Sequence, residues 1–292
     1  MTKPNVSPKT ERGGKISLAA RRALAYLVLG LLSFLCLFFF YILIINATRN
    51  HAQIQTGFSF LPGQSFGANW SNLMNNAQLP VWSGMRNSLF IAACTAGLTT
   101  YASSLTAFAI HAYDFKLKNA AFKFILLIMM VPSQVSVLGF LSMINGWGLM
   151  DSFVPLILPS IAAPIVFFFM KQYMESALPT AIVEAARIDG SGEFMTFNRI
   201  VLPILKPAIA VQAIFSFVTS WNNYFVPALV LRSNNKKTLP ILIAQLRSAD
   251  WLKFDMGQVY MMITLSIVPI IVVYLLLSKF IVRGVSLGSI KG

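Results

Sequence analysis

Residues 184–203 read EAARIDGSGEFMTFNRIVLP and lie between two long apolar runs of the chain. They belong to a longer connecting segment, 171–203, which carries four of the nine acidic residues. Connections of this length inside a compact protein are usually either functional or disordered. This one combines residues that favour helix with residues that end helices. The segment therefore predicts an ordered element held between two apolar runs.

The pattern inside this segment predicts two short helices. Thr180 is a typical N-cap for a first helix over residues 181–188. Gly190 and Gly192 should end that helix, because glycine readily adopts the left-handed backbone that closes a helix. Residues 193–201 can form the second helix. An ordered helical pair outside the membrane needs a surface to dock against, so we expect a cytoplasmic partner.

The rest of the chain has the composition of a membrane protein. Of its 292 residues, 57% are hydrophobic and 11% are charged, whereas about a quarter of the residues in a soluble domain are charged. The apolar residues form six runs of near-bilayer length, namely 23–45, 87–110, 124–144, 153–170, 203–231 and 258–280. We therefore predict an all-α integral membrane protein with six transmembrane helices.

Prolines should interrupt the third and fourth of these runs. Pro132 lies in the third run, and Pro155, Pro159 and Pro164 lie in the fourth. Each should kink its helix, because proline has no backbone N–H to donate. At membrane depth such breaks are tolerated where neighbouring helices or a cavity satisfy the freed carbonyls. The prolines therefore favour a packed bundle around a pathway.

The distribution of positive charge predicts the topology. The formal net charge is +14, but Lys and Arg lie between the apolar runs, whereas a nucleic-acid-binding protein gathers them on one face. With the N-terminus inside, 16 of the 23 Lys and Arg residues fall in inner segments and 7 in outer segments. We therefore predict cytoplasmic termini, with a tail (1–22), a transmembrane domain (23–281) that contains the loop 171–203, and a second tail (282–292).

The sequence contains no evident energy source. Carriers driven by protons or sodium usually keep ionisable groups at membrane depth, and the central parts of the six runs hold no Asp, Glu, His, Lys or Arg. The phosphate-binding pattern Gly-x-x-x-x-Gly-Lys-Ser/Thr does not occur in the sequence either. A separate ATPase that docks on the inner loop fits both observations. Sodium sites built from carbonyls and hydroxyls remain an alternative.

Catalytic and metal-binding patterns are also lacking in the sequence. His51 and His111 stand alone, without a second ligand at metal spacing. Cys36 and Cys94 each lie inside an apolar run, where a thiol is usually a small packing residue. We therefore predict a non-catalytic protein with no cofactor and no metal.

The inner loop resembles the signature of the permease subunits of binding-protein-dependent ABC importers. That family shares the pattern Glu-Ala-Ala, three residues, Gly, nine residues, Ile, one residue, Leu-Pro. The fixed positions are filled here by Glu184-Ala185-Ala186, Gly190, Ile200 and Leu202-Pro203. Further features resemble the carbohydrate-uptake branch: Ile188-Asp189-Gly190, Pro207, Trp221-Asn222-Asn223-Tyr224 with Pro227, and residues 284–292. The chain is most similar to the shorter, six-span subunit of maltose-type importers.

The resemblance implies a type I ABC importer permease fold with a cytoplasmic coupling helix, in the bacterial cytoplasmic membrane. It implies four partners: a second permease subunit, a dimer of ATPase subunits that binds the ATP, an extracytoplasmic sugar-binding protein, and membrane lipid. No nucleic acid is implied. The coupling helix would enter a cleft of the ATPase. There Ala185 and Ala186 allow close approach, Glu184 offers a charge-assisted acceptor, and Asp189 and Gly190 complete the signature.

Two departures from the family pattern are mild. Ser191 stands where the family often has Ala, and Ser289-Ile290 stands where Ala-Val is usual. The substitutes are of similar size, so the implied coupling role is not affected.

Five residues are candidates for lining a solute pathway: Gln134, Trp221, Asn222, Asn223 and Tyr224. Sugars present apolar ring faces and hydroxyl edges, which aromatic rings and amides match. The aromatic candidates can instead belong to the interfacial belt of a membrane protein. The outer segment 232–257 is long enough to touch a docked binding protein, and the simpler interpretation is a connector.

The function that the resemblance implies is translocation of a carbohydrate, most typically an oligosaccharide, into the cytoplasm. ATP hydrolysis by the partner subunits would drive it. One alternative is a permease of the same fold for another solute, such as a glycerol phosphodiester. The other is a stand-alone channel or an ion-coupled carrier, which would need no ATPase.

Overall fold

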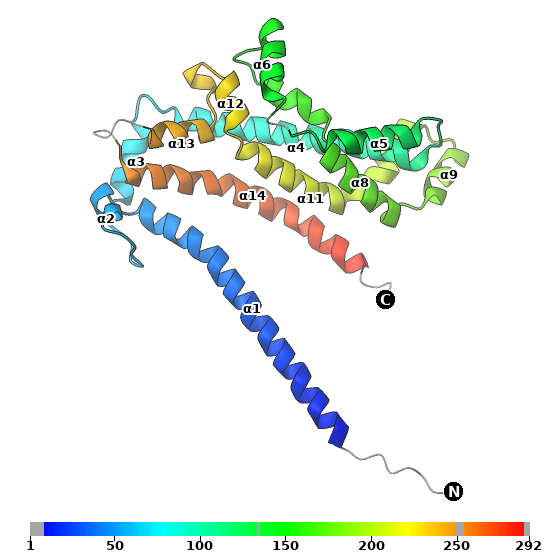
Figure 1. Cartoon of the computed structure of the whole chain (residues 1–292), viewed down its shortest axis with the longest axis horizontal. Coiled ribbons are helices and arrows are strands. Elements are labelled where there is room, and N and C mark those ends of the chain that lie inside the picture. The colour runs from blue at the N-terminus through cyan, green and yellow to red at the C-terminus, as the bar shows by residue number, and fades with distance from the viewer. Residues whose placement is uncertain (1–8, 133–134, 249–253, 289–292) are drawn as a thin grey trace. The chain divides into compact units, whose positions relative to one another are not determined.

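The computed structural model describes residues 9–132, 135–248 and 254–288, and within these ranges the chain forms helices and no strands (Figure 1). It divides into two compact units. Unit 1 comprises Met1–Trp70 and Asp255–Thr264, and unit 2 comprises Ser71–Phe254 and Leu265–Gly292. The all-α prediction is confirmed.

The helices follow one another with short connections. In chain order they are α1 (Lys9–Ala47), α2 (His51–Gln55), α3 (Phe66–Met74), α4 (Val81–Ala112), α5 (Lys118–Ile128), α6 (Val137–Gly146), α7 (Val154–Ile157), the 3₁₀ turn η1 (Leu158–Ile161), α8 (Pro164–Ala177), α9 (Thr180–Ile188), α10 (Glu193–Thr196), the π-helical turn η2 (Phe197–Val201), α11 (Leu202–Trp221), α12 (Phe225–Val230), the 3₁₀ turn η3 (Asn234–Lys236), α13 (Leu239–Arg247) and α14 (Met256–Gly288). Helix α1 therefore extends into the predicted N-terminal tail.

Five described segments are long and apolar enough to cross a bilayer: Leu18–Ala47, Val81–Ala112, Val154–Ala177, Glu193–Trp221 and Met256–Ile281. They match five of the six predicted runs. The third run is divided, because α5 ends at Ile128 and α6 begins at Val137. Pro132 lies in the gap, where it cannot donate a helical hydrogen bond. The six-span prediction thus holds approximately, as five segments long enough to cross a bilayer and one run divided between α5 and α6.

In unit 1, polar side chains close the end of α1. The amide Nδ2 of Asn69 donates to the carbonyls of Ala47 and Arg49, at 2.9 Å each. The buried Arg49 guanidinium donates to the carbonyls of Gly57, at 2.9 Å, and Gln53. These bonds satisfy carbonyls that a helix end leaves without a backbone partner. They fix the path of the chain where α1 ends.

The core of unit 2 is built around α4, which packs against α8 and α11 (Figure 1). The buried face of α4 consists largely of small and hydroxyl residues, among them Thr100, Ser103, Ser104 and Ala107. Thr100 and Ser104 donate their hydroxyl hydrogens to carbonyls four residues earlier in α4. Small side chains whose hydroxyls are satisfied within their own helix let neighbouring helices approach closely in a membrane.

Prolines shape two of the spans, as predicted for the fourth run. That span changes from α7 through η1 and restarts as α8 at Pro164. The span Glu193–Trp221 contains the π-helical turn Phe197–Val201 just before Pro203. Pro203 cannot donate to the carbonyl four residues before it, and a single π turn is a common way for a helix to absorb such a loss.

The two ends of α4 carry different structures. Near its start, the amide of Asn87 donates to the carbonyls of Asn235 and Lys237, at 2.8 and 3.0 Å, and Ser88 accepts from the backbone of Leu239. Just past its other end, Tyr113 contacts the segment around α9. At 1.5 Å per residue these two ends lie about 40 Å apart, enough to place them on opposite sides of a bilayer.

Asp151 binds the connection between α12 and α13, residues 231–238, which also contacts the start of α4. It has a left-handed backbone (φ 57°), and its carboxylate accepts from the backbone N–H groups of Arg232 and Ser233, at 2.9 and 3.0 Å, and from the Ser233 hydroxyl. The Nζ of Lys236 lies 3.3 Å from the same carboxylate. The hydrogen bonds from the Ser233 hydroxyl and the two backbone groups hold the pKa of Asp151 well below its usual range.

We expect Asp151→Asn to lower stability at neutral pH, because Asn tolerates the left-handed backbone but removes the charge that these donors bind. A depressed folded-state pKa contributes stability above the unfolded pKa of about 3.9, and this stability is lost as the pH falls toward the folded value. The difference between wild type and variant should therefore narrow below about pH 3.9. Thermal unfolding of the detergent-solubilised protein between pH 7 and pH 3 measures this.

Asp114→Asn is the matched control, because Asp114 pairs with Lys118 on the surface, with its side chain 99% exposed. Its unfolding temperature should stay close to that of wild type across the same pH range. Equal pH profiles for the two variants would contradict the role given to Asp151.

Candidate functional site: the α9 docking element

Helix α9 lies at one end of unit 2, between α8 and α10 (Figure 1). One face of it is packed: Val183 is 1% exposed and Ala186 is 6% exposed. Val183 joins the apolar core that also contains Met174, Leu178 and Phe197. Glu184 and Ala185 are exposed. The signature Glu-Ala-Ala is therefore divided, with Ala186 seating α9 on its own chain and Glu184 and Ala185 left available to a partner.

The start of α9 differs from the prediction. Thr180 is the first helical residue, and Pro179 stands at the N-cap with no side-chain capping bond. The predicted N-cap role of Thr180 is therefore wrong by one residue. The backbone angle φ of Pro179 is fixed near −65° by its ring, so it directs the chain into the helix without needing a cap of its own.

The end of α9 is closed as the sequence predicts. Gly190 has φ 78°, which is the left-handed conformation that favours glycine. Its N–H donates to the carbonyl of Arg187 at 3.0 Å, and the N–H of Ser191 donates to the carbonyl of Ala186 at 2.9 Å. This pair of bonds is the Schellman closure of a helix. It reverses the chain sharply after Asp189 and brings α10 back beside α9.

A polar cluster links the end of α9 to the start of α10. The Nε of Arg187 lies 2.9 Å from Oε1 of Glu193, and the hydroxyl of Tyr113 donates to the other carboxylate oxygen. The Arg187 guanidinium also stacks 4.8 Å above the Tyr113 ring. Burial and the hydrogen bond to Glu193 raise the pKa of Tyr113. Three separate elements thus fix the orientation of α9.

The second predicted helix is not a separate element. Residues of α10 continue through the π-helical turn η2 into α11, so Glu193–Trp221 is one continuous segment. The sequence favoured a break at Leu202-Pro203, but the π-helical turn Phe197–Val201 carries the helix past the missing N–H of Pro203. Of the two predicted loop helices, only α9 stands apart from the spans.

The structure also identifies exposed apolar residues that the sequence analysis did not select. Ile188, one turn after Glu184, is 87% exposed, and Phe194 and Met195 of α10 are exposed as well. Large apolar side chains that stay exposed at or beyond the end of a span are typical of a protein interaction surface. The amphipathic pattern of residues 180–195 could have indicated these exposed residues, because Val183 and Ala186 define the buried face of α9.

The predicted pathway residues do not form a single site. Gln134 lies outside the described residues. Trp221 is 2% exposed and stacks on Phe217 with ring centroids 5.7 Å apart. Trp221, Asn222 and Tyr224 together line a cavity of about 400 Å³ beside α13, whose lining also includes Arg247. Asn223 lines a different groove, between α4, α8 and α11.

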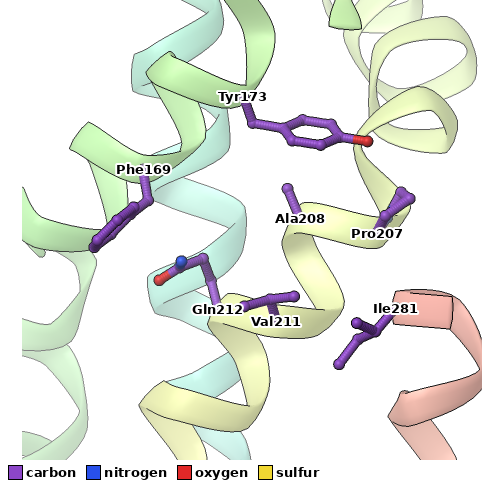
Figure 2. A pocket seen from close by; sticks show the side chains of 7 residues that line it. All are labelled: Phe169, Tyr173, Pro207, Ala208, Val211, Gln212 and Ile281. Carbon is purple, nitrogen blue, oxygen red and sulfur yellow. The ribbon is translucent and has the colours of Figure 1, made fainter. Parts of the chain in front are cut away.

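A third cavity, of about 280 Å³, lies between α8, α11 and α14 (Figure 2). Figure 2 shows Tyr173 reaching from α8 toward α11, and the lining residues are Phe169, Tyr173, Pro207, Ala208, Val211, Gln212 and Ile281. Only Tyr173 and Gln212 among them have polar side-chain groups. This lining suits acyl chains or packing helices better than a sugar.

The described residues hold no cluster of three or more His, Cys, Asp or Glu side chains that could bind a metal ion. Residues 180–196 carry the Glu-Ala-Ala signature and form the candidate site of unit 2, which we name the α9 docking element. It offers a well-packed helix, the exposed carboxylates of Glu184 and Asp189, and the exposed apolar side chains of Ile188, Phe194 and Met195.

Comparisons with known proteins identify the family of the chain. The family described as "binding-protein-dependent transport system inner membrane component" matches residues 100–287. The arabinooligosaccharides transport system permease protein AraQ of Bacillus subtilis is 38% identical over 209 residues, which is 70% of this chain and 72% of AraQ.

Two further relatives are similar over a greater length. The lactose transport system permease protein LacG of Rhizobium radiobacter is 30% identical over 268 residues, 91% of this chain and 95% of LacG. The sn-glycerol-3-phosphate transport system permease protein UgpE of Yersinia pestis is 32% identical over 264 residues, 88% of this chain and 92% of UgpE.

The fold has a counterpart among crystal structures. A chain of a bacterial ABC transporter involved in the import of the acidic polysaccharide alginate aligns with a TM-score of 0.74 and 19% identity. The alignment covers 95% of this chain and 99% of that one. At this level of identity the likeness concerns the fold.

We expect Gly190→Ala to loosen the end of α9, whereas Gly192→Ala should not. A Cβ would meet open space at both positions, but φ is 78° at Gly190 and −66° at Gly192. The alanine at position 190 should cost about 1 kcal/mol of local stability. Amide hydrogen exchange of residues 180–196 should therefore speed up about fivefold in Gly190→Ala. Equal exchange in both variants would rule out the left-handed closure as the feature that orders α9.

Proposed function

Because this chain belongs to the family of binding-protein-dependent transport system inner membrane components, we propose that it is a permease subunit of an ATP-driven importer. It would carry a carbohydrate, most typically an oligosaccharide, across the bacterial cytoplasmic membrane. The chain itself would perform no catalytic step. ATP would be bound and hydrolysed by separate subunits.

One observation carries this proposal: α9 is an ordered helix that stands apart from the spans and offers an unpaired signature face. Glu184 and Ala185 are exposed while Val183 and Ala186 hold the helix in place. A surface with exposed carboxylates and exposed apolar side chains fits a cleft that supplies donors and an apolar wall. The partner we infer is an ATPase subunit, present twice because the importer would pair this chain with a second permease.

The rigidity of α9 supports a mechanical role. A movement of the ATPase can reach the spans only if the contact element does not bend or unfold. Arg187, Glu193 and Tyr113 tie α9 to α10 and to the end of α4, and α10 continues into α11. A displacement of α9 would therefore pass directly to two spans.

The inferred ATPase partner also predicts how the chain is oriented in the membrane. If α9 meets an ATPase in the cytoplasm, the end of α4 near Tyr113 is inside and the connection around Asp151 and residues 231–238 is outside. Both termini would be cytoplasmic, in agreement with the distribution of Lys and Arg. The outer connection would then be available to an extracytoplasmic binding protein.

The relatives support a sugar as the solute. Two of them, AraQ and LacG, are named for arabinooligosaccharides and lactose. The similarity to UgpE, named for sn-glycerol-3-phosphate, favours a second candidate, a phosphate ester of glycerol. Family membership argues against a stand-alone channel or an ion-coupled carrier.

We expect Glu184→Lys and Gly190→Pro to uncouple uptake from ATP hydrolysis without preventing membrane insertion. Glu184→Lys reverses the exposed charge, and Gly190→Pro removes the left-handed closure and its N–H donor. The complex would be reconstituted in proteoliposomes with its ATPase and binding protein. ATP-dependent uptake should fall at least tenfold, which corresponds to about 1.4 kcal/mol, while the ATPase rate no longer responds to solute-loaded binding protein.

Asp114→Lys provides a control with the same charge change at the same end of unit 2, at an exposed residue outside α9 whose side chain pairs with Lys118. It should keep coupled uptake. Wild-type uptake by both α9 variants, or an equal loss in Asp114→Lys, would remove the docking role.

A further inference from the structure

A groove of about 370 Å³ lies between α4, the break from η1 to α8, and α11. Its polar lining includes Thr95, Thr99, Ser160, Ser216, Thr219 and Asn223. None of the residues that line it is Asp, Glu, Lys, Arg or His. A groove of this volume lies in the range of sites for small ligands.

The polar residues form stripes along their helices. Ser216 and Thr219 are three residues apart and share one face near the end of α11, and Asn223 follows just after the helix ends at Trp221. Thr95 and Thr99 do the same near the middle of α4. Both helices belong to candidate membrane spans. A polar stripe at this depth usually faces a protein interior or a water-filled path, because lipid offers no hydrogen bonds.

The proline break supplies the third wall of the groove. Pro164 has no N–H for the carbonyl of Ser160 four residues earlier, and the hydroxyl of Thr99 donates to that carbonyl at 2.9 Å. The hydroxyl of Ser160 donates to the carbonyl of Ile157 at 2.6 Å. The break is therefore stabilised as an open bend, and it keeps α8 from closing over the stripes.

Thr95 supplies a polar atom that can still form a hydrogen bond. Its hydroxyl oxygen is buried and has no hydrogen-bond partner within the described ranges. Leaving such a group unpaired costs about 1–3 kcal/mol. Nearby, the exposed ring of Phe215 gives the groove an apolar surface. Hydroxyls that both donate and accept, an amide and one aromatic face together match a polyhydroxylated ring.

We propose that this groove is the solute-contact site of the chain and that it selects neutral polyhydroxylated solutes over phosphate esters. The inference rests on the proposed function and narrows its substrate class. A phosphate group needs Arg or Lys partners to replace its water, and the groove offers none. An anion would also lose hydration there without compensation, at a cost of several kcal/mol. Arg247 lines the separate cavity beside Tyr224 and not this groove.

The test uses the complete importer in proteoliposomes, with neutral di- and trisaccharides of arabinose, glucose and galactose as one set of probes and sn-glycerol 3-phosphate as the charged probe. Wild type should accumulate at least one neutral probe and not the phosphate ester. Ser216→Ala and Thr219→Val each remove one hydroxyl. Each should raise KM for the neutral probe about fivefold, as loss of one hydrogen bond to the solute predicts.

Thr106→Val is the matched control, because Thr106 is an exposed threonine of α4 that does not line the groove and donates its hydroxyl hydrogen within its own helix. Its KM should equal that of wild type. A second measurement avoids any dependence on the choice of sugar. With Cys36 and Cys94 replaced by serine, Thr219→Cys should react with a membrane-impermeant methanethiosulfonate, because it lines the groove. Thr106→Cys should not react, because it lies within a span and outside the groove.

The outcomes separate the two proposals. If ATP drives no uptake of any probe in wild type, the proposed function itself fails. If uptake occurs but Ser216→Ala and Thr219→Val behave like Thr106→Val, or if Thr219→Cys stays unlabelled, the groove is not the contact site while the function stands. Preferential uptake of sn-glycerol 3-phosphate would overturn the neutral-solute class.

Discussion

The structure depends on how firmly α9 is held at the end of α4. Burial of Val183 and Ala186 fixes its inner face, and the contacts among Arg187, Glu193 and Tyr113 fix its direction. The ion pair is partly exposed, so by itself it contributes little stability. Its value lies in geometry, because it joins a short helix, the start of a span and the end of another span. A nine-residue helix would be marginal in water, and here tertiary contacts make it a rigid projection.

Prolines give the spans their functional shape. In a lipid environment each proline removes a hydrogen bond that has to be replaced from within the protein. The π-helical turn before Pro203 and the Thr99 hydroxyl opposite Ser160 are two replacements of this kind. The first lies next to the docking element, and the second opens the hydroxyl-lined groove. Both features therefore arise from the same chemical constraint.

The two ends of α4 contact different parts of unit 2. At one end, Asn87 and Asp151 bind the connection around residues 231–237 through backbone groups. At the other end, Tyr113 receives α9. A single 32-residue helix thus links the connection around residues 231–237 with the α9 docking element. The groove at Thr95 and Thr99 lies between them along the same helix.

The sequence by itself determined the membrane class, most of the spans, the left-handed closure at Gly190 and the family signature at Glu184, because these depend on local composition, on spacing and on the conformational freedom of glycine. Only the tertiary structure decided that Ala186 faces inward, that residues 193–221 are continuous, and that Trp221 and Asn223 lie in different surroundings. It alone aligned Thr99 of α4 with Ser160 and with the stripe on α11. These relations join residues dozens of positions apart, and the period of one helix carries no information about which neighbour covers each of its faces.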